Sequence, residues 1–190
     1  MIKSLGSYWP VVIDLETSGV DYNKHAILEI AAVPLLKSDS GWGYCEVWHE
    51  HIKPFQGAEF SPEAMEVHGI DVDHPFRMAI TEKDFLVNWA RKLQEVATAN
   101  GCNRCMLVGH NAHFDLNFLM AAVNRCQIKL PLHSFTCLDT ATLGAFLGAE
   151  TVLPKLLNKY RIRYDGNSAH SAAYDAEITA QLMVKWLNEN

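Results

Sequence analysis

The sequence contains no long apolar run and no low-complexity segment. Its apolar runs all fall short of the ~20 residues that a membrane span needs, and its start lacks the basic-then-apolar order of a secretory signal. No repeat and no stretch rich in proline, glycine or serine divides the 190 residues, of which 49% are hydrophobic. We therefore expect one domain over residues 1–190, cytoplasmic and without a membrane partner.

Cysteine and positive charge are also scarce. The five cysteines are an odd number, and the CxxC spacing of Cys102 and Cys105 has no second pair beside it, so we expect reduced, structural thiols. Lysine and arginine total 16 against 22 aspartates and glutamates, giving a net charge of −6 that by itself argues against a nucleic-acid partner. Binding depends on local patches, however, and cations in a carboxylate site would neutralise part of this charge.

Four carboxylates and one histidine stand in three short motifs. Asp14 and Glu16 end an apolar, β-branched run, and as residues i and i+2 of a strand they would point to the same side. Asp115 follows a second short apolar run, where the pattern turns polar and then helical. His170 and Asp175 stand at the start of the last helical pattern.

Carboxylates that converge in a folded protein repel one another and take up protons unless cations keep them ionised. A ligand set made almost entirely of oxygen favours Mg²⁺ or Mn²⁺ over zinc. Two such ions about 4 Å apart would stabilise the attacking and leaving oxygens of an in-line phosphoryl displacement. The motifs therefore predict a site for two divalent metal ions.

In this order, acid-x-acid, a middle aspartate and His-x4-Asp, the motifs resemble those of the DEDDh 3′-to-5′ exonucleases. Within that superfamily the sequence is most similar to the bacterial ribonuclease T family, which trims the 3′ ends of tRNA and other stable RNAs. The similar stretches run almost from end to end of the chain, at residues 10–14, 28–32, 62–64, 69–71, 101–104, 110–112 and 169–172.

The resemblance implies a role for each residue of the three motifs. Asp14 would contact both ions, Glu16 and Asp175 would hold the ion beside the attacking water, and Asp115 would help to hold the second ion. His170 would be the general base, a task that suits an imidazole with an ordinary pKa near 6.5. The reaction would release 5′-mononucleotides from single-stranded 3′ ends of RNA, with single-stranded DNA as a further substrate.

The resemblance also indicates residues that bind the substrate. The hydroxyl or backbone of Thr17 would bind the terminal 3′-hydroxyl, and Phe114 and Phe135 match two positions where the family stacks aromatic rings on the terminal bases. Val20 and Val67 stand at the two other positions where the family has phenylalanine. Because a valine side chain cannot stack, we expect weaker discrimination against terminal cytosine than is typical of the family.

Arg104 matches a basic residue that the family uses to bind RNA, and Lys3 is the only basic residue near the start of the first strand. The resemblance implies a homodimer, in which the basic patch of one subunit serves the active site of the other. Further candidates for a basic patch, each equally well explained as a solvated helix face, are Arg125 with Lys129, and Lys155, Lys159, Arg161 and Arg163.

The remaining polar residues of note are interpreted as structural. His110 and Asn111 match the family's second motif and are expected to organise the loop around Asp115. Glu29, which recurs in the family, is expected to support the site. Structural roles are also expected for His25, His49, His51, His68, His74, His113 and His133.

The expected fold is the α/β layout of ribonuclease H-like proteins. It has a mixed five-stranded sheet, three antiparallel strands first and then parallel ones, flanked by helices. Strands are predicted at 11–16, 26–36, 44–53, 104–109 and 138–139. Helices are predicted from Ser61-Pro62 onward and at 81–99, 113–127, 140–147, 151–160 and 171–187.

Two other enzymes share the five site residues, an oligoribonuclease and a proofreading-type DNA exonuclease. The end-to-end similarity argues against both. A non-catalytic module that binds nucleic-acid ends is a third alternative, and the intact set of site residues argues against it.

Overall fold

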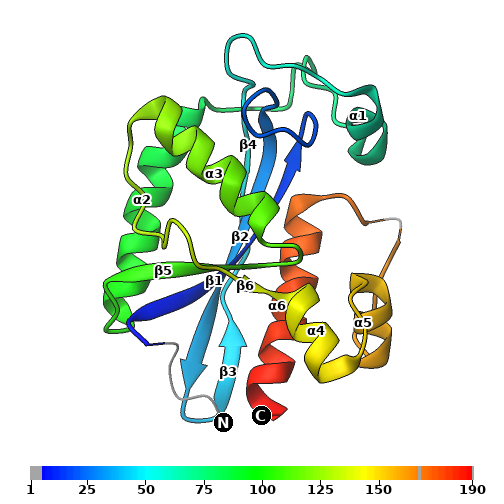
Figure 1. The fold of residues 1–190 in the computed structure, drawn as a ribbon. Coiled ribbons are helices and arrows are strands. Elements are labelled where there is room, and N and C mark those ends of the chain that lie inside the picture. The colour runs from blue at the N-terminus through cyan, green and yellow to red at the C-terminus, as the bar shows by residue number, and fades with distance from the viewer. Residues whose placement is uncertain (1–5, 167, 190) are drawn as a thin grey trace.

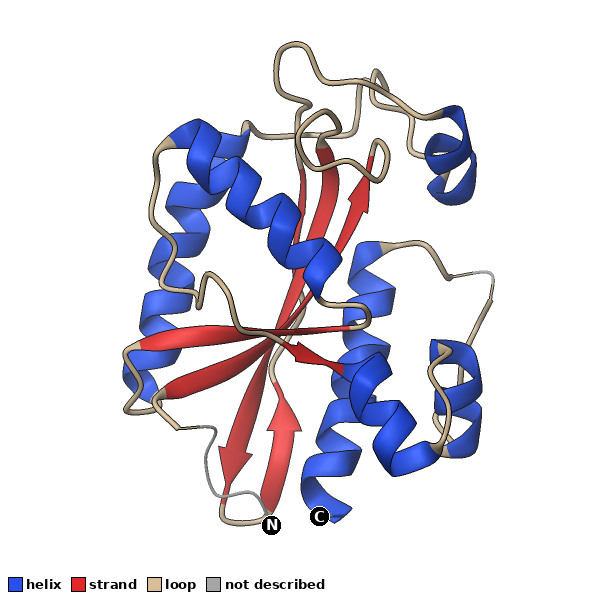
Figure 2. Ribbon diagram, viewed as in Figure 1, coloured by secondary structure: helices blue, strands red, loops and turns tan. Residues whose placement is uncertain are grey.

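The computed structural model describes residues 6–166 and 168–189, so Lys3 lies outside the described residues. A twisted mixed sheet runs through the molecule with helices on both of its faces (Figures 1 and 2). Its strands follow the order β3-β2-β1-β5-β6, with β4 also paired to β2. β2 is antiparallel to β1, whereas β5 and β6 are parallel to their neighbours, so the predicted order of antiparallel and then parallel strands is confirmed.

The strand bounds are close to those expected from the sequence, except at one position. The strands are β1 (Tyr8–Thr17), β2 (Ile27–Ser38), β3 (Gly41–Tyr44), β4 (Trp48–His51), β5 (Arg104–Gly109) and β6 (Leu138–Asp139). The strand predicted at 44–53 is in fact two short strands, β3 and β4, which pair one after the other with β2. Within the described residues the sheet therefore has six strands instead of the predicted five.

Pro34 explains this interruption. It lies in β2 between the parts that pair with β3 and with β4, and a proline has no N–H to donate to a neighbouring strand. Its carbonyl still accepts a hydrogen bond from the Cys45 N–H at 2.9 Å. Residues 45–47 lie opposite only residues 33–34, so the partner strand bulges and restarts as β4.

Several of the helices begin after a residue whose side chain caps them. The helices are α1 (Pro62–His68), α2 (Glu82–Ala99), α3 (His113–Cys126), α4 (Thr140–Gly148), α5 (Leu153–Lys159) and α6 (Ala172–Glu189). The Ser61 side chain accepts a hydrogen bond from the Ala64 N–H, and the Thr81 side chain does the same for the Asp84 N–H. No helix among the described residues is long and apolar enough to cross a membrane.

Different helices cover the two faces of the sheet. Trp48 on β4 packs against α2, with its ring 6.0 Å from the ring of Trp89, so the next residue, His49, points to the other face. On that other face α6 packs across β1, β2 and β3. One apolar core joins both layers, and the prediction of a single domain over residues 1–190 stays a prediction. The polar side chains of β1, β2 and β4 therefore gather beneath the start of α6.

Candidate active site

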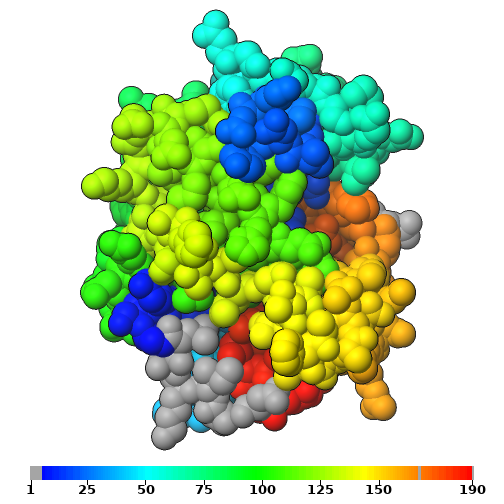
Figure 3. Space-filling model, viewed as in Figure 1, coloured from blue at the N-terminus to red at the C-terminus, as the bar shows by residue number. Residues whose placement is uncertain are grey.

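Asp14 and Glu16 lie on the same face of β1, as the strand pattern predicts. The residues that flank Asp14, Ile13 and Leu15, are 1% and 6% exposed and belong to the core, whereas both carboxylates are only partly buried. In the space-filling view, blue atoms of β1 are visible in a hollow between green α3 and the orange segment at the start of α6 (Figure 3). The strand thus presents both acids to a recess that solvent can enter.

Asp115 approaches this pair from the first turn of α3 and is only 4% exposed. Its carboxylate accepts a hydrogen bond from the backbone of Leu15, the residue between the two acids of β1. The loop before α3 is fixed on its other side, because the Asn111 N–H donates to Asp139 Oδ1 at 2.8 Å. His110 Nδ1 lies 3.0 Å from the Thr140 hydroxyl, so both His110 and Asn111 link this loop to the start of α4, and their role in organising the loop around Asp115 stays a prediction.

Asp139 is a residue whose role the sequence interpretation missed. Besides holding Asn111, it begins α4 by accepting from the Ala141 N–H at 3.1 Å and from the Thr142 hydroxyl at 2.7 Å. The motif Asp-Thr-Ala-Thr before an apolar helix was the available signal for such a cap. Asp139 also lies close enough to Asp115 to raise its pKa.

Asp175 and His170 complete the arrangement from the start of α6. The His170 N–H donates to Asp175 Oδ2 at 2.9 Å, and His170 has a left-handed backbone with φ 63°. Glu16, His170 and Asp175 each offer one metal-binding atom, and these atoms all lie within 4.8 Å of one another. The structure therefore brings together all five residues of the three sequence motifs.

Burial and neighbouring carboxylates raise the pKa of each of the four carboxylates. Burial, followed by the charges of Asp175 and Glu29, raises the pKa of Glu16 to about 8. Burial and the neighbouring carboxylates also raise the pKa of Asp14 and of Asp115 well above the usual range. Burial raises the pKa of Asp175 as well. Oxygen donors in this state suit hard divalent cations, because bound cations would restore the ionised form.

Glu29 lies directly opposite Glu16 in the β1–β2 register. Burial raises the pKa of Glu29, but the hydrogen bond and charge of His49 outweigh burial, so the net pKa is lowered. His49 Nε2 is 2.7 Å from Glu29 Oε1, and the Ser171 hydroxyl is 3.5 Å from the same oxygen. Glu29 thus joins the edge of the sheet to the start of α6, and the supporting role expected of it stays a prediction.

Thr17 and Val20 lie at the turn that follows β1, and Val67 lies in α1. The Thr17 hydroxyl donates to Gly19 O at 2.7 Å, and Thr17 O is 3.2 Å from His68 Nε2 at the end of α1. Val20 and Val67 are 79% and 57% exposed, one in the turn and the other beside His68. The turn and α1 are therefore neighbours, and both valines are open to a ligand.

The other residues predicted to bind the substrate lie farther apart from one another. Phe114 is partly buried against the core, with its ring 4.9 Å from that of Phe118, whereas Phe135 is 82% exposed in the loop before β6. Arg104 begins β5, whose far end at Gly109 leads to Asp115, so about 17 Å of strand separates Arg104 from the carboxylate end. It lines a separate hollow together with Lys129.

Among the candidate basic residues, Arg125 forms an ion pair within the fold. Its guanidinium lies 2.7 Å from Glu82 Oε1 and 4.0 Å from the centre of the Phe55 ring. Glu82 is 6% exposed, so this is a largely buried pair. Arg125 is therefore neither a solvated helix residue nor a free member of a basic patch, because it forms one half of this ion pair.

Comparison with known proteins identifies the class to which this arrangement belongs. The RNase_T family model, described as exonuclease, matches residues 11–183. A full-length 3′-exonuclease has a similar structure, with a TM-score of 0.75 and 20% identity over 96% of this chain, which spans only 62% of that protein. The nuclease domain of 3′hExo, a DEDDh family member bound to rAMP, has a TM-score of 0.73 and 19% identity over 98% of this chain and 95% of that domain.

E. coli Exonuclease I in complex with a dT13 oligonucleotide is similar as well. Its TM-score is 0.73, with 17% identity over 95% of this chain and 41% of that protein. At these identities the likeness shows the fold, and it confirms the ribonuclease H-like exonuclease architecture predicted from the sequence.

Proposed function

Because the chain belongs to the RNase_T family of exonucleases, we propose that it is a metal-dependent 3′-to-5′ exoribonuclease that releases 5′-mononucleotides from single-stranded 3′ ends. Its proposed substrates are tRNA and other stable RNAs. The observation that carries this proposal is the convergence of four carboxylates and His170, contributed by β1, α3 and the start of α6.

Asp14, Glu16, Asp115 and Asp175 are proposed to hold two divalent cations, Mg²⁺ or Mn²⁺. Bound there, the cations supply Lewis-acid activation of water and neutralise charge at the scissile phosphate. The buried position of Asp115 and its hydrogen bond from Leu15 keep this carboxylate fixed relative to β1. A ligand set held by a strand and two helix starts needs little rearrangement when it binds metal and substrate.

His170 is proposed as the general base. It is exposed in the loop before α6, and its backbone N–H is held by Asp175, which anchors the loop and leaves the imidazole ring free to accept a proton from the attacking water. The left-handed backbone at this histidine is a conformation that a non-glycine residue adopts at a cost, and such conformations are concentrated at functional sites.

Recognition of the 3′ end is proposed to use the turn after β1. The Thr17 hydroxyl hydrogen is engaged with Gly19 O, so the lone pairs of the hydroxyl oxygen are proposed to accept from the terminal 3′-hydroxyl. Val20 and Val67 offer apolar contact to the last bases, and Phe114 and the exposed Phe135 are proposed to stack on them.

Arg104 supports the proposal of a homodimer. About 17 Å of strand separates it from the carboxylate end of β5, so it cannot contact the terminal nucleotide in its own subunit. We propose that it binds the RNA that enters the partner's site. The prediction of a cytoplasmic location stays untested.

Mixing two inactive variants tests the dimer. If Arg104 acts on the partner's site, a mixture of Asp14→Asn and Arg104→Ala subunits should regain activity, because one of the two sites in each mixed dimer is complete. Lys129→Ala, in the same hollow, serves as the matched variant for general loss of charge. A fully active monomer in sedimentation at the assay concentration would show that the dimer is not required.

The proposed activity is tested with a panel of 5′-labelled oligonucleotides. Release of mononucleotides from tRNA-like 3′ overhangs should require Mg²⁺ or Mn²⁺ and stop with EDTA. Since the similar structures include one bound to rAMP and one bound to DNA, the panel includes single-stranded DNA of the same sequence. Faster cleavage of dinucleotides would favour the oligoribonuclease alternative, faster cleavage of DNA the proofreading type, and binding without any release the non-catalytic module.

A further inference from the structure

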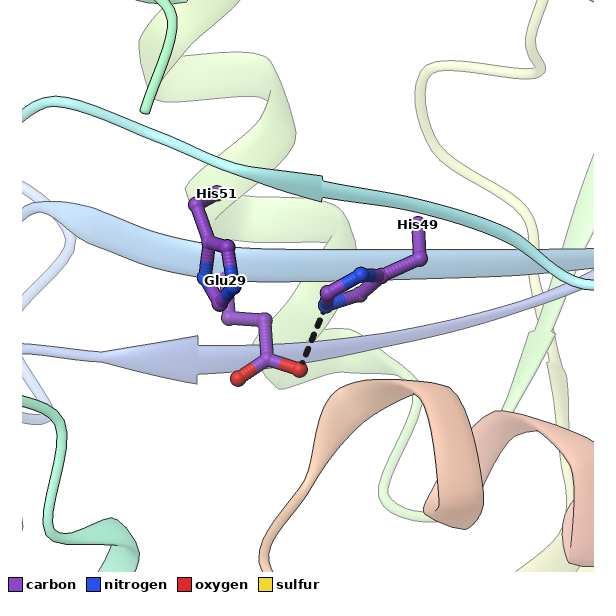
Figure 4. Close-up of side chains that lie close together, drawn as sticks. All are labelled: Glu29, His49 and His51. Atoms are coloured by element: carbon purple, nitrogen blue, oxygen red, sulfur yellow. Dashed lines mark hydrogen bonds and ion pairs between the residues drawn. The ribbon is translucent and has the colours of Figure 1, made fainter. Parts of the chain in front are cut away.

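A second group of metal-binding side chains lies beside the proposed active site. Glu29 projects from β2, and His49 and His51 project from β4 toward its carboxylate (Figure 4). One ligand atom of each lies within 4.8 Å of the others, and His49 Nε2 is 2.7 Å from Glu29 Oε1. The two histidines have no task in the proposed hydrolysis.

The sheet register explains why these three side chains meet. Glu29 pairs directly with His51, and Ala31 pairs with His49, so all three side chains point to the face covered by α6. The spacing His-x-His places both imidazoles on one side of the strand. The small side chain of Ala31 lets the ring of His49 lean along the strand toward Glu29, where the hydrogen bond holds it.

The chemistry of the donors differs from that of the neighbouring carboxylates. Two imidazoles and one carboxylate form a ligand set used by zinc, with the fourth position left for water. Imidazole suits zinc, copper, iron and nickel, whereas Mg²⁺ prefers oxygen donors. The same face of the sheet thus holds two oxygen donors on β1, and a second group with Glu29 on β2 and two nitrogen donors on β4.

Small side-chain movements would bring the three ligand atoms close enough to bind one ion. With bonds of about 2.0–2.1 Å, tetrahedral ligand atoms lie roughly 3.3 Å apart, so a separation of up to 4.8 Å must shrink by roughly 1.5 Å at most. Rotation of an imidazole about its side-chain bonds supplies a movement of that size. The side chain of His49 is 35% exposed, which gives an ion a route from solvent, whereas that of Glu29 is 8% exposed.

Two neighbouring features affect how tightly these three side chains would bind a metal ion. Nδ1 of His51 is buried and has no hydrogen-bond partner among the described residues, so this ring is incompletely satisfied without a ligand. Arg77 donates to Leu28 O and, at 2.9 Å, to Ile52 O, and its positive charge interacts with Glu29. That charge opposes cation binding and favours a metal that forms strong bonds to nitrogen.

We propose that Glu29, His49 and His51 form a second metal site, selective for a divalent transition metal such as Zn²⁺ over Mg²⁺. The site is separate from the proposed catalytic ions and does not depend on the proposed function.

Zinc titration by calorimetry tests the site directly. The Asp175→Asn variant is titrated in excess Mg²⁺, so that the carboxylate cluster does not compete for zinc. One Zn²⁺ per chain should bind, and adding His49→Gln or His51→Gln should weaken binding at least tenfold. His74→Gln is the matched control, since His74 is exposed and lies in a different segment, after α1. Unchanged zinc affinity in both site variants, or displacement of the zinc by Mg²⁺, would overturn the proposal.

A second measurement needs no substitution at the site. X-ray absorption of the zinc-loaded chain, in the same Mg²⁺ excess, should show two imidazole ligands and oxygen. Zinc in the carboxylate cluster would show one imidazole at most, because His170 is the only histidine in that group. A spectrum with fewer than two imidazoles would therefore overturn the proposal even if the glutamine variants failed to fold.

Discussion

Removing divalent cations should make the stability of this protein fall steeply as the pH rises. The reason is Glu16, whose pKa is raised from 4.5 to about 8 by burial and then by the charges of Asp175 and Glu29. Between these pH values the folded chain holds a proton that the unfolded chain has lost. The stability present below about pH 4.5 is therefore lost as the pH rises through 8.

The size of the effect follows from the same values. A difference of about 3.5 between the two pKa values corresponds to about 5 kcal/mol, at 1.36 kcal/mol per pH unit. This is an upper limit, because solvent reaches the partly exposed carboxylate and weakens the effect. It is still comparable to the whole stability of many domains, roughly 5–15 kcal/mol. The raised pKa values of Asp14, Asp115 and Asp175 act in the same direction.

The assay is urea unfolding at pH 5.5 and pH 8.5, each with EDTA and with Mg²⁺. In EDTA the midpoint should be lower at pH 8.5, and Mg²⁺ should recover most of the difference, since a ligand at 100 times its Kd adds about 2.7 kcal/mol. Glu16→Gln should make the EDTA-treated protein more stable at pH 8.5 and remove part of the pH dependence. Glu95→Gln is the control, because the Glu95 side chain is 64% exposed and its pair with Arg91 contributes little.

Two results would refute this reasoning. The first is equal stability of the EDTA-treated protein at both pH values. The second is a Glu16→Gln variant that is no more stable than the native protein at pH 8.5 in EDTA. Either result would mean that the four carboxylates do not repel one another in the metal-free fold, and the argument for cations would then lose its basis.

Three further predictions concern catalysis and binding. Asp14→Ala or Asp175→Ala should abolish mononucleotide release with the fold intact by circular dichroism, and near-native turnover with Mg²⁺ in either variant would contradict the metal assignment. His170→Ala should lower kcat far more than it weakens RNA binding and should remove the acidic limb of the pH profile, whereas lost binding at unchanged kcat would indicate a structural role. Val20→Phe with Val67→Phe should tighten binding to single-stranded 3′ ends by up to roughly 2–6 kcal/mol, less the apolar contact already made by the valines. The native protein should cleave ends in A, G, U and C at similar rates, and a strong stall at terminal CC would refute this interpretation of the valines.

The sequence predicted those parts of the site that depend on local rules. Strand alternation placed Asp14 and Glu16 on one face, and Ser61 followed by Pro62 marked the start of α1. Motif order predicted that Asp115 and Asp175 would join the pair, and this depended on the resemblance, since no local rule brings residues so far apart in sequence together.

Features that depend on pairing between distant strands could not be predicted in the same way. The interruption between β3 and β4 is caused by Pro34, which lies on the neighbouring strand. His49 and His51 looked like ordinary structural histidines, because their alignment with Glu29 exists only once the β2–β4 register is fixed. The pair of Arg125 with Glu82, 43 residues apart, was hidden for the same reason.

The register across β1, β2 and β4 also explains why His49 and the start of α6 are tied to the site. Glu16 and Glu29 face each other directly, and like charges in that position destabilise a sheet. A hydrogen bond from His49 stabilises the charged form of Glu29, and the Ser171 hydroxyl reaches the same oxygen. Since Ser171 follows His170 in the chain, the interaction that offsets the repulsion also holds the segment that carries the proposed base. A perturbation of His49 on the edge strand should therefore reach the proposed site through Glu29, without any contact between His49 and the substrate.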